Sequence, residues 1–222
     1  MPTINECCLC SQIAGAPEND LIARLLPEEP YARRVLFESD AFAAIPSLGP
    51  LAVGHSLLCP KEHVRSFAEL DPTLHGELAA TKRVLIERLM EMTGDAIHVF
   101  EHGMASAGNR IVCTVDHAHM HFVPLPFLHH PGDLGTGDWV EFDGSLAALR
   151  EISAKREYVL YEAPAGAAFV RVANGAGIES QYMRRRIAAW LGKEAQWNWR
   201  ATPEAGLVDA TWRRFSSLQP SR

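Results

Sequence analysis

Hydrophobic residues in the first half of the chain come in short runs separated by turn residues, which is the pattern of strands in a sheet. Ser39 and Asp40 separate the first two runs, while Pro60 and Pro124 close two later ones. The predicted strands are residues 35–38, 41–45, 55–59, 97–101 and 111–123. This order predicts a mostly antiparallel sheet.

A helical period interrupts the strand pattern between Asp71 and Gly94. Asp71 is a good N-cap, Pro72 suits the first helical position, and Gly94 suits the end of a helix. Apolar residues recur between them at helical spacing, at Leu74, Leu78, Leu85, Leu89 and Met92. We therefore predict one long helix that packs a hydrophobic stripe on the sheet.

A polar, glycine-rich segment from His129 to Asp138 marks a candidate domain boundary. Beyond it the pattern alternates between helix and strand. The predicted elements are a helix at 146–152, strands at 158–161 and 168–172, a helix at 178–191 and a last helix that starts at Thr202-Pro203. The sequence thus predicts an α+β fold, with a domain of residues 1–128 and a smaller α+β extension of residues 129–222.

Composition is that of a globular protein: of the 222 residues, 47% are hydrophobic, enough for a sizeable core. The net charge of −6 argues against a protein that coats nucleic acid, which would need a broad basic surface. No apolar run approaches the length of a membrane span, and the N-terminus lacks the pattern of a signal peptide. We expect a cytoplasmic protein with no membrane partner.

Three histidines alternate with apolar residues in the last strand predicted before the boundary. Because side chains alternate between the faces of a strand, His117, His119 and His121 would share one face, with neighbours about 7 Å apart. Ala118, Met120 and Phe122 would fill the other face. Such a row could contact a polyphosphate or hold a metal ion, and a purely structural role is the least favoured interpretation.

The five cysteines are unevenly spread along the chain. Three lie together in Cys7-Cys8-Leu9-Cys10, where the spacing of Cys7 and Cys10 lets two thiolates reach one metal ion. Cys59 and Cys113 lie within apolar stretches and are expected to be buried core residues. A metal site at Cys7 and Cys10 is favoured over a disulfide framework.

The segment from His117 to Pro124 resembles the motif of the histidine-triad family of nucleotide hydrolases and transferases. Residues 54–64, running from Gly-His through an apolar strand to Pro-Lys-Glu-His, are similar to a second family segment, and the N-terminal CxxC is similar to that of many members. The resemblance covers about residues 5–128. It implies a histidine-triad fold with a mostly antiparallel sheet and a long helix, and a homodimer.

Further details resemble the C-terminal domain of Cwf-type splicing factors. These are the segment from Ser47 to His55, Phe100-Glu101 before the triad, and residues 180–185 with Trp199 downstream. The splicing proteins commonly carry glutamine where this chain has His121. Retention of His121 favours a catalytic protein over a scaffold.

The resemblance implies a role for each triad residue. His119 would attack the phosphate, His121 would contact the phosphate and support the leaving group, and His117 would orient the centre. Thr114 falls where many members have a serine that touches the phosphate, and Ser47 falls where many have an aspartate that binds ribose. Because Thr114 and Ser47 differ from the residues usual in the family, we expect the contacts to phosphate and ribose to differ here.

The family's zinc-bearing members also imply a metal site in this chain. Its ligands would be Cys7, Cys10, His63 and His117, with a structural role for Zn²⁺. Cys8 would be a bystander, or would replace Cys7 if the register shifts. No organic cofactor is expected.

The C-terminal extension contains a basic run at residues 184–186 and two tryptophans, Trp197 and Trp199. A charge run is often just a solvated helix face, but arginine also binds phosphate in a bidentate way, so Arg184 is a candidate substrate-binding residue. The tryptophans could stack on a base, although core packing is the commoner role.

The leading hypothesis is a nucleotide phosphohydrolase or nucleotidyltransferase for dinucleoside polyphosphates or nucleoside phosphoramidates. It would act through a covalent nucleotidyl-histidine. One alternative is a metal-dependent hydrolase in which His117, His119 and His121 hold a catalytic ion. Another is a non-catalytic nucleotide- or RNA-binding module, which the acidic chain and His121 disfavour.

Overall fold

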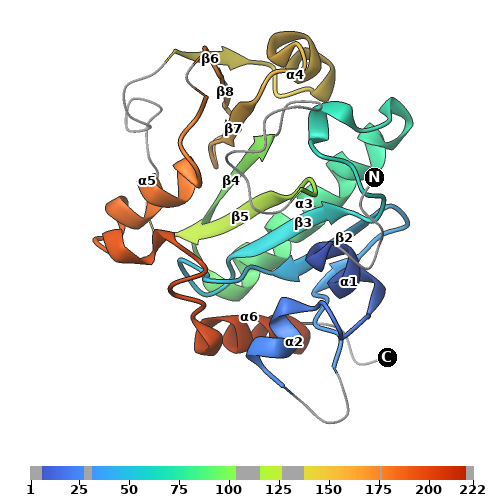
Figure 1. The fold of residues 1–222 in the computed structure, drawn as a ribbon, viewed down its shortest axis with the longest axis vertical. Coiled ribbons are helices and arrows are strands. Elements are labelled where there is room, and N and C mark those ends of the chain that lie inside the picture. Colours follow the sequence, from blue (N-terminus) through green and yellow to red (C-terminus); the bar gives the residue numbers. More distant parts are fainter. Residues whose placement is uncertain (1–6, 28–31, 104–115, 127–137, 176, 219–222) are drawn as a thin grey trace.

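The computed structural model describes residues 7–27, 32–103, 116–126, 138–175 and 177–218 (Figure 1). In this part of the chain eight strands form one sheet in the order β1-β2-β3-β5-β4-β7-β8-β6, with antiparallel pairing between neighbours. The strands are β1 Phe37–Glu38, β2 Phe42–Pro46, β3 Ser56–Pro60, β4 Ala96–Gly103, β5 Met120–Leu125, β6 Trp139–Phe142, β7 Tyr158–Glu162 and β8 Ala168–Val172. The predicted α+β class is confirmed.

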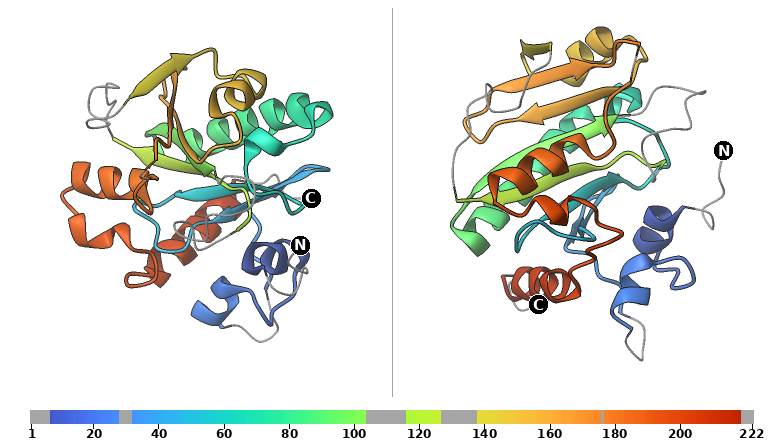
Figure 2. Two further views of the ribbon diagram at one scale, coloured as in Figure 1. Left: turned by 45° about the horizontal axis from the view of Figure 1, so that its top comes forward. Right: turned by 60° about the vertical axis from the view of Figure 1, so that its left-hand side comes forward.

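Helices cover both faces of the sheet, as the two further views show (Figure 2). The α-helices are α1 Cys8–Ala14, α2 Leu21–Leu25, α3 His75–Thr93, α4 Leu146–Ser153, α5 Tyr182–Trp190 and α6 Ala205–Ser217. Short 3-10 turns lie at Phe67–Glu69, Pro72–Leu74 and Glu194–Trp197. Within the described residues, no helix has the length and apolarity required to cross a membrane.

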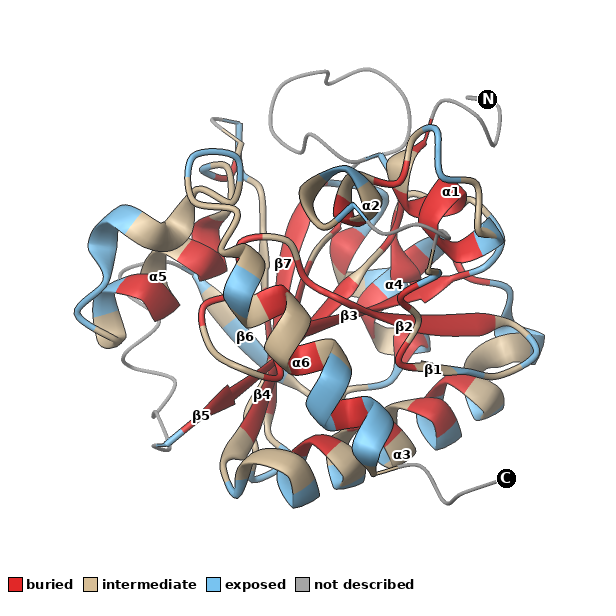
Figure 3. Ribbon diagram, turned by 90° about the horizontal axis from the view of Figure 1, so that it is seen from below, coloured by how far each residue is buried: buried red, intermediate tan, exposed pale blue. Residues whose placement is uncertain are grey.

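One face of the sheet packs against α3, α4 and α6. Leu78, Leu85 and Leu89 of α3 are buried there, as their helical spacing predicts, while the opposite side of the helix faces solvent (Figure 3). Alternate strand residues complete this core, including Met120 and Phe122 of β5. The apolar half of the histidine segment therefore anchors it to the main core.

The other face carries two smaller hydrophobic clusters. One lies under α1 and uses residues of β2 and β3, among them Ile45 and Cys59. The second lies under α5 and uses residues of β4, β5, β7 and β8, among them Phe100 and Val123. Because α1 and α5 cover different strands, the polar side of the histidine segment lies between them.

The signals at the ends of the long helix are confirmed. The Asp71 carboxylate accepts a hydrogen bond from the Thr73 backbone N–H, and a 3-10 turn from Pro72 leads into α3. Gly94 ends the helix with a left-handed φ of 75°. Both ends of this helix were therefore predictable from local sequence to within a few residues.

The sheet continues beyond residue 128, because β7 pairs with β4 and β8 pairs with β7. Helix α6 also returns to pack against α3 and β2. The division into residues 1–128 and 129–222 stays a prediction, while strands from both parts share one sheet. The glycine-rich segment proposed as the boundary lies almost wholly outside the described residues.

Several predicted boundaries are wrong. The strand predicted from residue 111 begins at Met120 in its described part, because the backbone bends at His117 and the Ala118 N–H bonds to the Val64 carbonyl at 2.7 Å. Helix α5 begins at Tyr182 because Gln181 has a left-handed φ of 56°, which a helix does not continue through. The last helix begins at Ala205, not at Thr202. Helices α1 and α2 and strand β6 were not predicted.

Candidate active site

Two cysteines and two histidines meet beside the first turn of α1. Cys7 precedes the helix and Cys10 lies in it, so their side chains project toward the same side. One candidate ligand atom from each of Cys7, Cys10, His63 and His117 lies within 4.8 Å of all the others. The structure thus brings together the four residues predicted as metal ligands.

The donor set fits a tetrahedral metal ion. The Nδ1 atom of His117 lies 3.2 Å from Cys10 Sγ and 3.6 Å from Cys7 Sγ, and His63 Nδ1 lies 3.4 Å from Cys10 Sγ. Ligands around tetrahedral zinc are separated by about 3.5 Å, given metal–ligand bonds of about 2.0–2.3 Å. Two thiols and two imidazoles at this spacing are zinc-type ligands.

The second nitrogen of His117 supports the same interpretation. Its Nε2 lies 2.8 Å from the carbonyl oxygen of Pro60, and a carbonyl can only accept, so Nε2 carries the proton. This leaves the lone pair on Nδ1, which faces the thiols. Burial, followed by the charge of Cys7, raises the pKa of Cys10 to about 12, so a thiolate at Cys10 requires a nearby cation.

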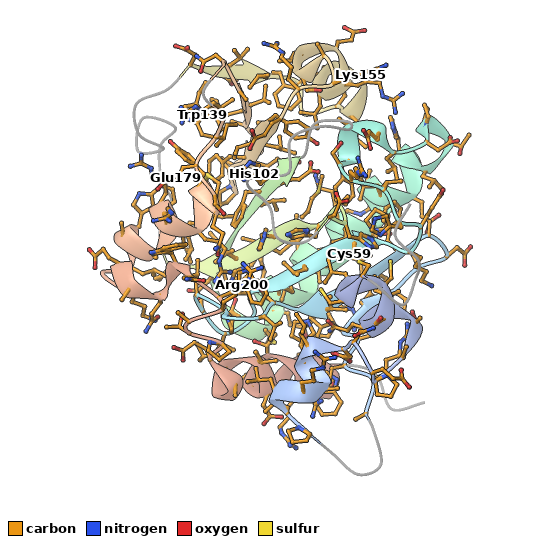
Figure 4. All side chains as sticks on the ribbon, in the orientation of Figure 1. Cys59, His102, Trp139, Lys155, Glu179 and Arg200 are labelled. Atoms are coloured by element: carbon orange, nitrogen blue, oxygen red, sulfur yellow. The ribbon has the colours of Figure 1, made fainter. Side chains whose placement is uncertain are left out.

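Cys8 is not part of this group. Its half-buried thiol lines the adjacent pocket, and burial raises its pKa to about 11. The geometry therefore favours Cys7 and Cys10, and not Cys8, as the metal ligands. Cys59 is buried under α1, as expected, and Figure 4 labels it on β3.

His119 lies just before β5 with one ring nitrogen fixed and the other available. Its Nδ1 lies 2.7 Å from the backbone carbonyl of His117, so Nδ1 carries the proton and Nε2 carries the lone pair. Nε2 has no hydrogen-bond partner among the described residues. Burial lowers the pKa of His119, which keeps the ring neutral at pH 7. A neutral imidazole with a free Nε2 is a competent nucleophile.

His121 belongs to a chain of hydrogen bonds that starts at a backbone amide. The Leu51 N–H donates to His55 Nδ1 at 3.1 Å, so the proton of His55 is on Nε2. His55 Nε2 lies 2.9 Å from His121 Nδ1 and donates to it, which leaves the proton of His121 on its own Nε2. Burial lowers the pKa of both rings well below the usual value. His121 therefore presents a neutral N–H donor.

Packing fixes the orientation of the His121 ring. Phe100 stacks on it with a centroid distance of 4.3 Å and an interplanar angle of 11°. The His119 ring meets it edge-on with a centroid distance of 5.1 Å. His119 and His121 thus form one unit, whereas the His117 ring contacts the cysteine cluster.

A pocket opens beside these two rings. Its walls come from α1, α2, the end of β2 and the loop after it, β3, the histidine segment, α5 and the segment around Trp199. The lining residues are Cys8, Leu9, Gln12, Leu21, Pro46, Ser47, Leu48, Leu57, His119, His121, Arg184 and Trp199. The pocket is mostly apolar, with the histidines, Gln12, Ser47 and Arg184 among its polar groups, which is typical of a small-ligand site.

Arg184 is buried at the edge of this pocket, 3% exposed, and is not on a solvated helix face. Its Nε donates to the Trp197 carbonyl at 2.8 Å, and Nη2 donates to the Gly49 carbonyl. Nη1 has no hydrogen-bond partner within the described part of the chain. Burial lowers the pKa of Arg184 to about 10, so the side chain remains cationic at pH 7.

The other predicted residues lie in different places. Ser47 is buried in the pocket wall, where its hydroxyl donates to the Leu48 carbonyl at 3.2 Å. Thr114 lies outside the described residues. Trp199 lines the pocket, while Trp197 packs under the Arg185 guanidinium at 3.3 Å from the ring centroid. Sequence reasoning gave no role to His55, although its place four residues after Leu51 fits a turn-held side chain.

The geometry disfavours a metal ion held by the three triad histidines. Among the described residues, the group able to hold an ion contains His117 with the cysteines and includes neither His119 nor His121. His121 Nδ1 is already engaged by His55. The triad is therefore divided between a metal-type cluster and a ligand pocket.

Residues 29–127 match the model of the HIT domain, the histidine-triad domain. The chain contains a HIT domain. The match ends shortly after β5, so the HIT domain comprises β1 to β5, α3, His63 and the triad. This match does not test the resemblance to Cwf-type splicing factors, which stays a prediction.

Curated relatives of the HIT domain cover part of the chain. It is 27% identical over 121 residues to an Arabidopsis thaliana protein named adenylylsulfatase HINT3 and 28% identical over 92 residues to an uncharacterized HIT-like protein of Borreliella burgdorferi. These segments are 54% and 40% of this chain, and the chain spans 52% and 63% of the length of the two relatives.

Solved structures similar to this chain include a zinc-bound histidine-triad family protein from Mycobacterium smegmatis. It is 21% identical, has a TM-score of 0.41, and the alignment covers 58% of this chain and 78% of that one.

Proposed function

We propose that the chain is a nucleotide hydrolase or nucleotidyltransferase in which His119 attacks the α-phosphorus of a nucleotide. The observation that carries the proposal is the fixed tautomer of His119. Its Nδ1–H is held by the His117 carbonyl at 2.7 Å, and its free Nε2 belongs to a half-buried ring that lines the pocket. A nucleophile needs its lone pair available and aimed at the substrate.

His121 supplies a hydrogen-bond donor at the same place. Because the chain from Leu51 through His55 fixes the proton on His121 Nε2, this N–H is available to a phosphate oxygen as negative charge develops. No reorganisation is needed at the moment of reaction, since Phe100 and His55 already hold the ring. A preorganised donor of this type lowers the barrier to phosphoryl transfer.

Arg184 and Ser47 are the proposed substrate-binding residues. Arg184 brings a cation to a mostly apolar pocket, which suits the negative charge of a phosphate or polyphosphate. Ser47 offers a hydroxyl in the wall at the position implied for ribose recognition. A hydroxyl is a weaker ribose ligand than a carboxylate, so we expect the base and the phosphates to contribute more of the affinity.

The reaction has two steps. In the first, His119 Nε2 forms a bond to phosphorus, and the bond from phosphorus to the leaving group breaks. In the second, water attacks the phosphorus and releases His119, or another acceptor takes the place of water. A nucleoside phosphoramidate, a dinucleoside polyphosphate and adenylyl sulfate all fit this scheme. Adenylyl sulfate is included because of the name of the Arabidopsis relative.

We also propose that Cys7, Cys10, His63 and His117 hold a structural zinc ion, as their spacing supports. When bound, zinc would supply a cross-link between the N-terminal helix and the sheet. His117 would then connect the two sites, because its ring faces the cysteines while its carbonyl orients His119. Helix α1 also contributes Cys8, Leu9 and Gln12 to the pocket wall.

A cytoplasmic homodimer remains part of the proposal, supported by the family resemblance. Reduced thiols are needed at Cys7 and Cys10, and the cytoplasm maintains them. Sedimentation of the purified protein tests the dimer directly.

His119→Ala tests the proposed nucleophile. We expect turnover of adenosine 5′-phosphoramidate, diadenosine tetraphosphate and adenylyl sulfate to fall by about 10³-fold or more for each substrate the wild type uses. The matched control is His75→Ala, because His75 begins α3 on the opposite face of the sheet. Wild-type rates in His119→Ala, with unchanged thermal unfolding, would contradict the proposal.

A further inference from the structure

His102 lies on β4 beside the histidine segment, at a position to which the triad motif gives no role. Phe100 pairs with His121 and Glu101 pairs with Met120, so extending this register by one residue brings His102 opposite His119. Phe100 stacks on His121, and side chains two residues apart share a face of a strand. His102 therefore lies on the same face of the sheet as His119 and His121.

A carboxylate from the next strand fixes the His102 ring. Glu157 directly precedes β7, and its Oε1 lies 2.7 Å from His102 Nε2. The side chains of His102 and Glu157 are 12% and 9% exposed. Nε2 is the nitrogen that faces the carboxylate, so Nδ1 is the one left for another partner. Figure 4 labels His102 near the carboxyl end of β4, beside β7.

Glu157 is itself held in place. The Ile178 N–H approaches its Oε2 at 3.4 Å, and the Ala173 N–H donates to its backbone carbonyl at 2.8 Å. Ile178 is a buried core residue at the start of the segment that leads to α5. This support means that the Glu157 carboxylate is preorganised, and His102 Nδ1 has no hydrogen-bond partner among the described residues.

His102 is not among the residues that line the pocket, and it lies across the histidine segment from the β3 wall. On the sheet the pocket wall comes from β2, β3 and His121 of β5, with Arg184 of α5 on another side, whereas His102 belongs to β4, and β5 lies between β3 and β4. A nucleotide whose nucleoside occupies the pocket brings its phosphorus to His119. Its leaving group then extends away from the pocket, on the side of β4.

The electrostatic influence of His102 is consistent with this closeness. Burial is the main cause that lowers the pKa of His119 and of His121, and the charge of His102 acts in the same direction on both. A positive charge near the phosphorus would also stabilise a leaving group that departs with an electron pair.

We infer that His102, oriented by Glu157, is a further catalytic residue that protonates the leaving group. As the bond from phosphorus breaks, His102 Nδ1–H donates its proton to the departing nitrogen or oxygen, and the ring becomes neutral while retaining the proton on Nε2. In the second step, neutral Nδ1 takes a proton from the attacking water, and His119 departs. This restores His102 and balances the protons over one turnover.

The inference rests on the proposed function and predicts a dependence on the leaving group. An amine must be protonated to leave, whereas 4-nitrophenolate leaves without a proton. His102→Gln should lower kcat/KM for adenosine 5′-phosphoramidate by about 10²–10⁴-fold, and for the 4-nitrophenyl ester of adenosine 5′-phosphate by less than about tenfold. Glu157→Gln should show the same dependence on the leaving group with a smaller loss of kcat/KM, since the His102 ring remains but its orientation is less constrained.

Glu162→Gln is the matched control, because Glu162 ends the same strand and pairs with Lys82 away from the site. An equal loss on both substrates in His102→Gln would overturn the inference, and so would wild-type rates on the amidate. Both results would leave the His119 proposal standing. If wild-type protein turns over neither substrate, the proposed function fails, and this role fails with it.

Discussion

Gly49 and Trp199 are in direct backbone contact. A Cβ atom on Gly49 would lie 2.5 Å from the Trp199 Cα, and the Gly49 N–H already donates to the Pro203 carbonyl at 3.0 Å. Gly49 also has a left-handed φ of 55°, which glycine tolerates best. The loop after β2 and the C-terminal segment are therefore fitted closely, and both line the pocket through Leu48 and Trp199.

Gly49→Ala should displace the C-terminal segment from the pocket. We expect a loss of about 1–3 kcal/mol in the free energy of unfolding and a rise in KM, because both strain and overlap oppose the native contact. Urea denaturation and steady-state kinetics measure the two effects. Gly166→Ala is the control for strain alone, since Gly166 has a φ of 93° but nothing within 4 Å of an added Cβ. Equal losses of stability and equal KM values in the two variants would contradict the close contact between Gly49 and Trp199.

Arg184→Lys tests whether the guanidinium has a role beyond its charge. Lysine keeps the charge but cannot bond both the Gly49 and Trp197 carbonyls while presenting a further donor. We expect KM to rise about tenfold, equivalent to about 1.4 kcal/mol of binding, with a smaller change in kcat. Arg186→Lys is the neighbouring control, because Arg186 packs over Tyr182. Unchanged kinetics in Arg184→Lys would remove its substrate role.

Cys10→Ser should release the metal ion and Cys8→Ser should not. Cys10 belongs to the four-residue cluster, whereas Cys8 faces the pocket. Metal analysis of protein purified without added zinc should give near one zinc ion per chain for wild type and Cys8→Ser, and much less for Cys10→Ser. Thermal unfolding should follow the same order, since metal binding adds to folding. Metal-free wild-type protein that unfolds at the same temperature would refute the structural zinc site.

Glu101→Gln should change how stability depends on pH. Burial raises the pKa of Glu101 to about 7, although hydrogen bonds from Tyr158 at 2.6 Å and the Phe67 N–H at 2.8 Å oppose the rise. The folded state then keeps a proton that the unfolded state has lost. The free energy of unfolding therefore falls as pH rises from about 4.5 to about 7, and it is flat above this range.

The glutamine variant lacks this titration. Between pH 5 and pH 8, wild-type protein should lose stability relative to Glu101→Gln by on the order of 3 kcal/mol. The comparison uses the difference in the free energy of unfolding between the two proteins, so the contributions of other titrating groups cancel. A constant difference across this range would mean that Glu101 has an ordinary pKa.

Much of the fold follows from local sequence. The strands that contain residues 41–45 and 168–172 and the helix between Asp71 and Gly94 were predicted from short apolar runs, turn residues, capping residues and helical spacing. Each of these signals acts within a few residues. Helix α1 gave no such signal, because it is short and its Cys7 N-cap makes no side-chain bond. Its helical form accompanies tertiary packing against β2 and β3.

The site was partly predictable for the same reason. The ligand set of Cys7, Cys10, His63 and His117 came from the family resemblance, and the structure brings these residues together. The separate directions of the His117 and His119 rings could not be predicted, because the Ala118 N–H pairs with the distant Val64 carbonyl. The partnership of His102 with Glu157 spans two strands and leaves no pattern in the sequence.

Trapping the reaction intermediate tests the central claim most directly. Wild-type protein mixed with a limiting amount of adenosine 5′-phosphoramidate, quenched in the first turnover and digested, should yield a peptide bearing an adenylyl group on His119. The account predicts that the adduct forms and decays at the rate of turnover and is absent in His119→Ala. An adduct on another residue, or rapid turnover without an adduct, would contradict it.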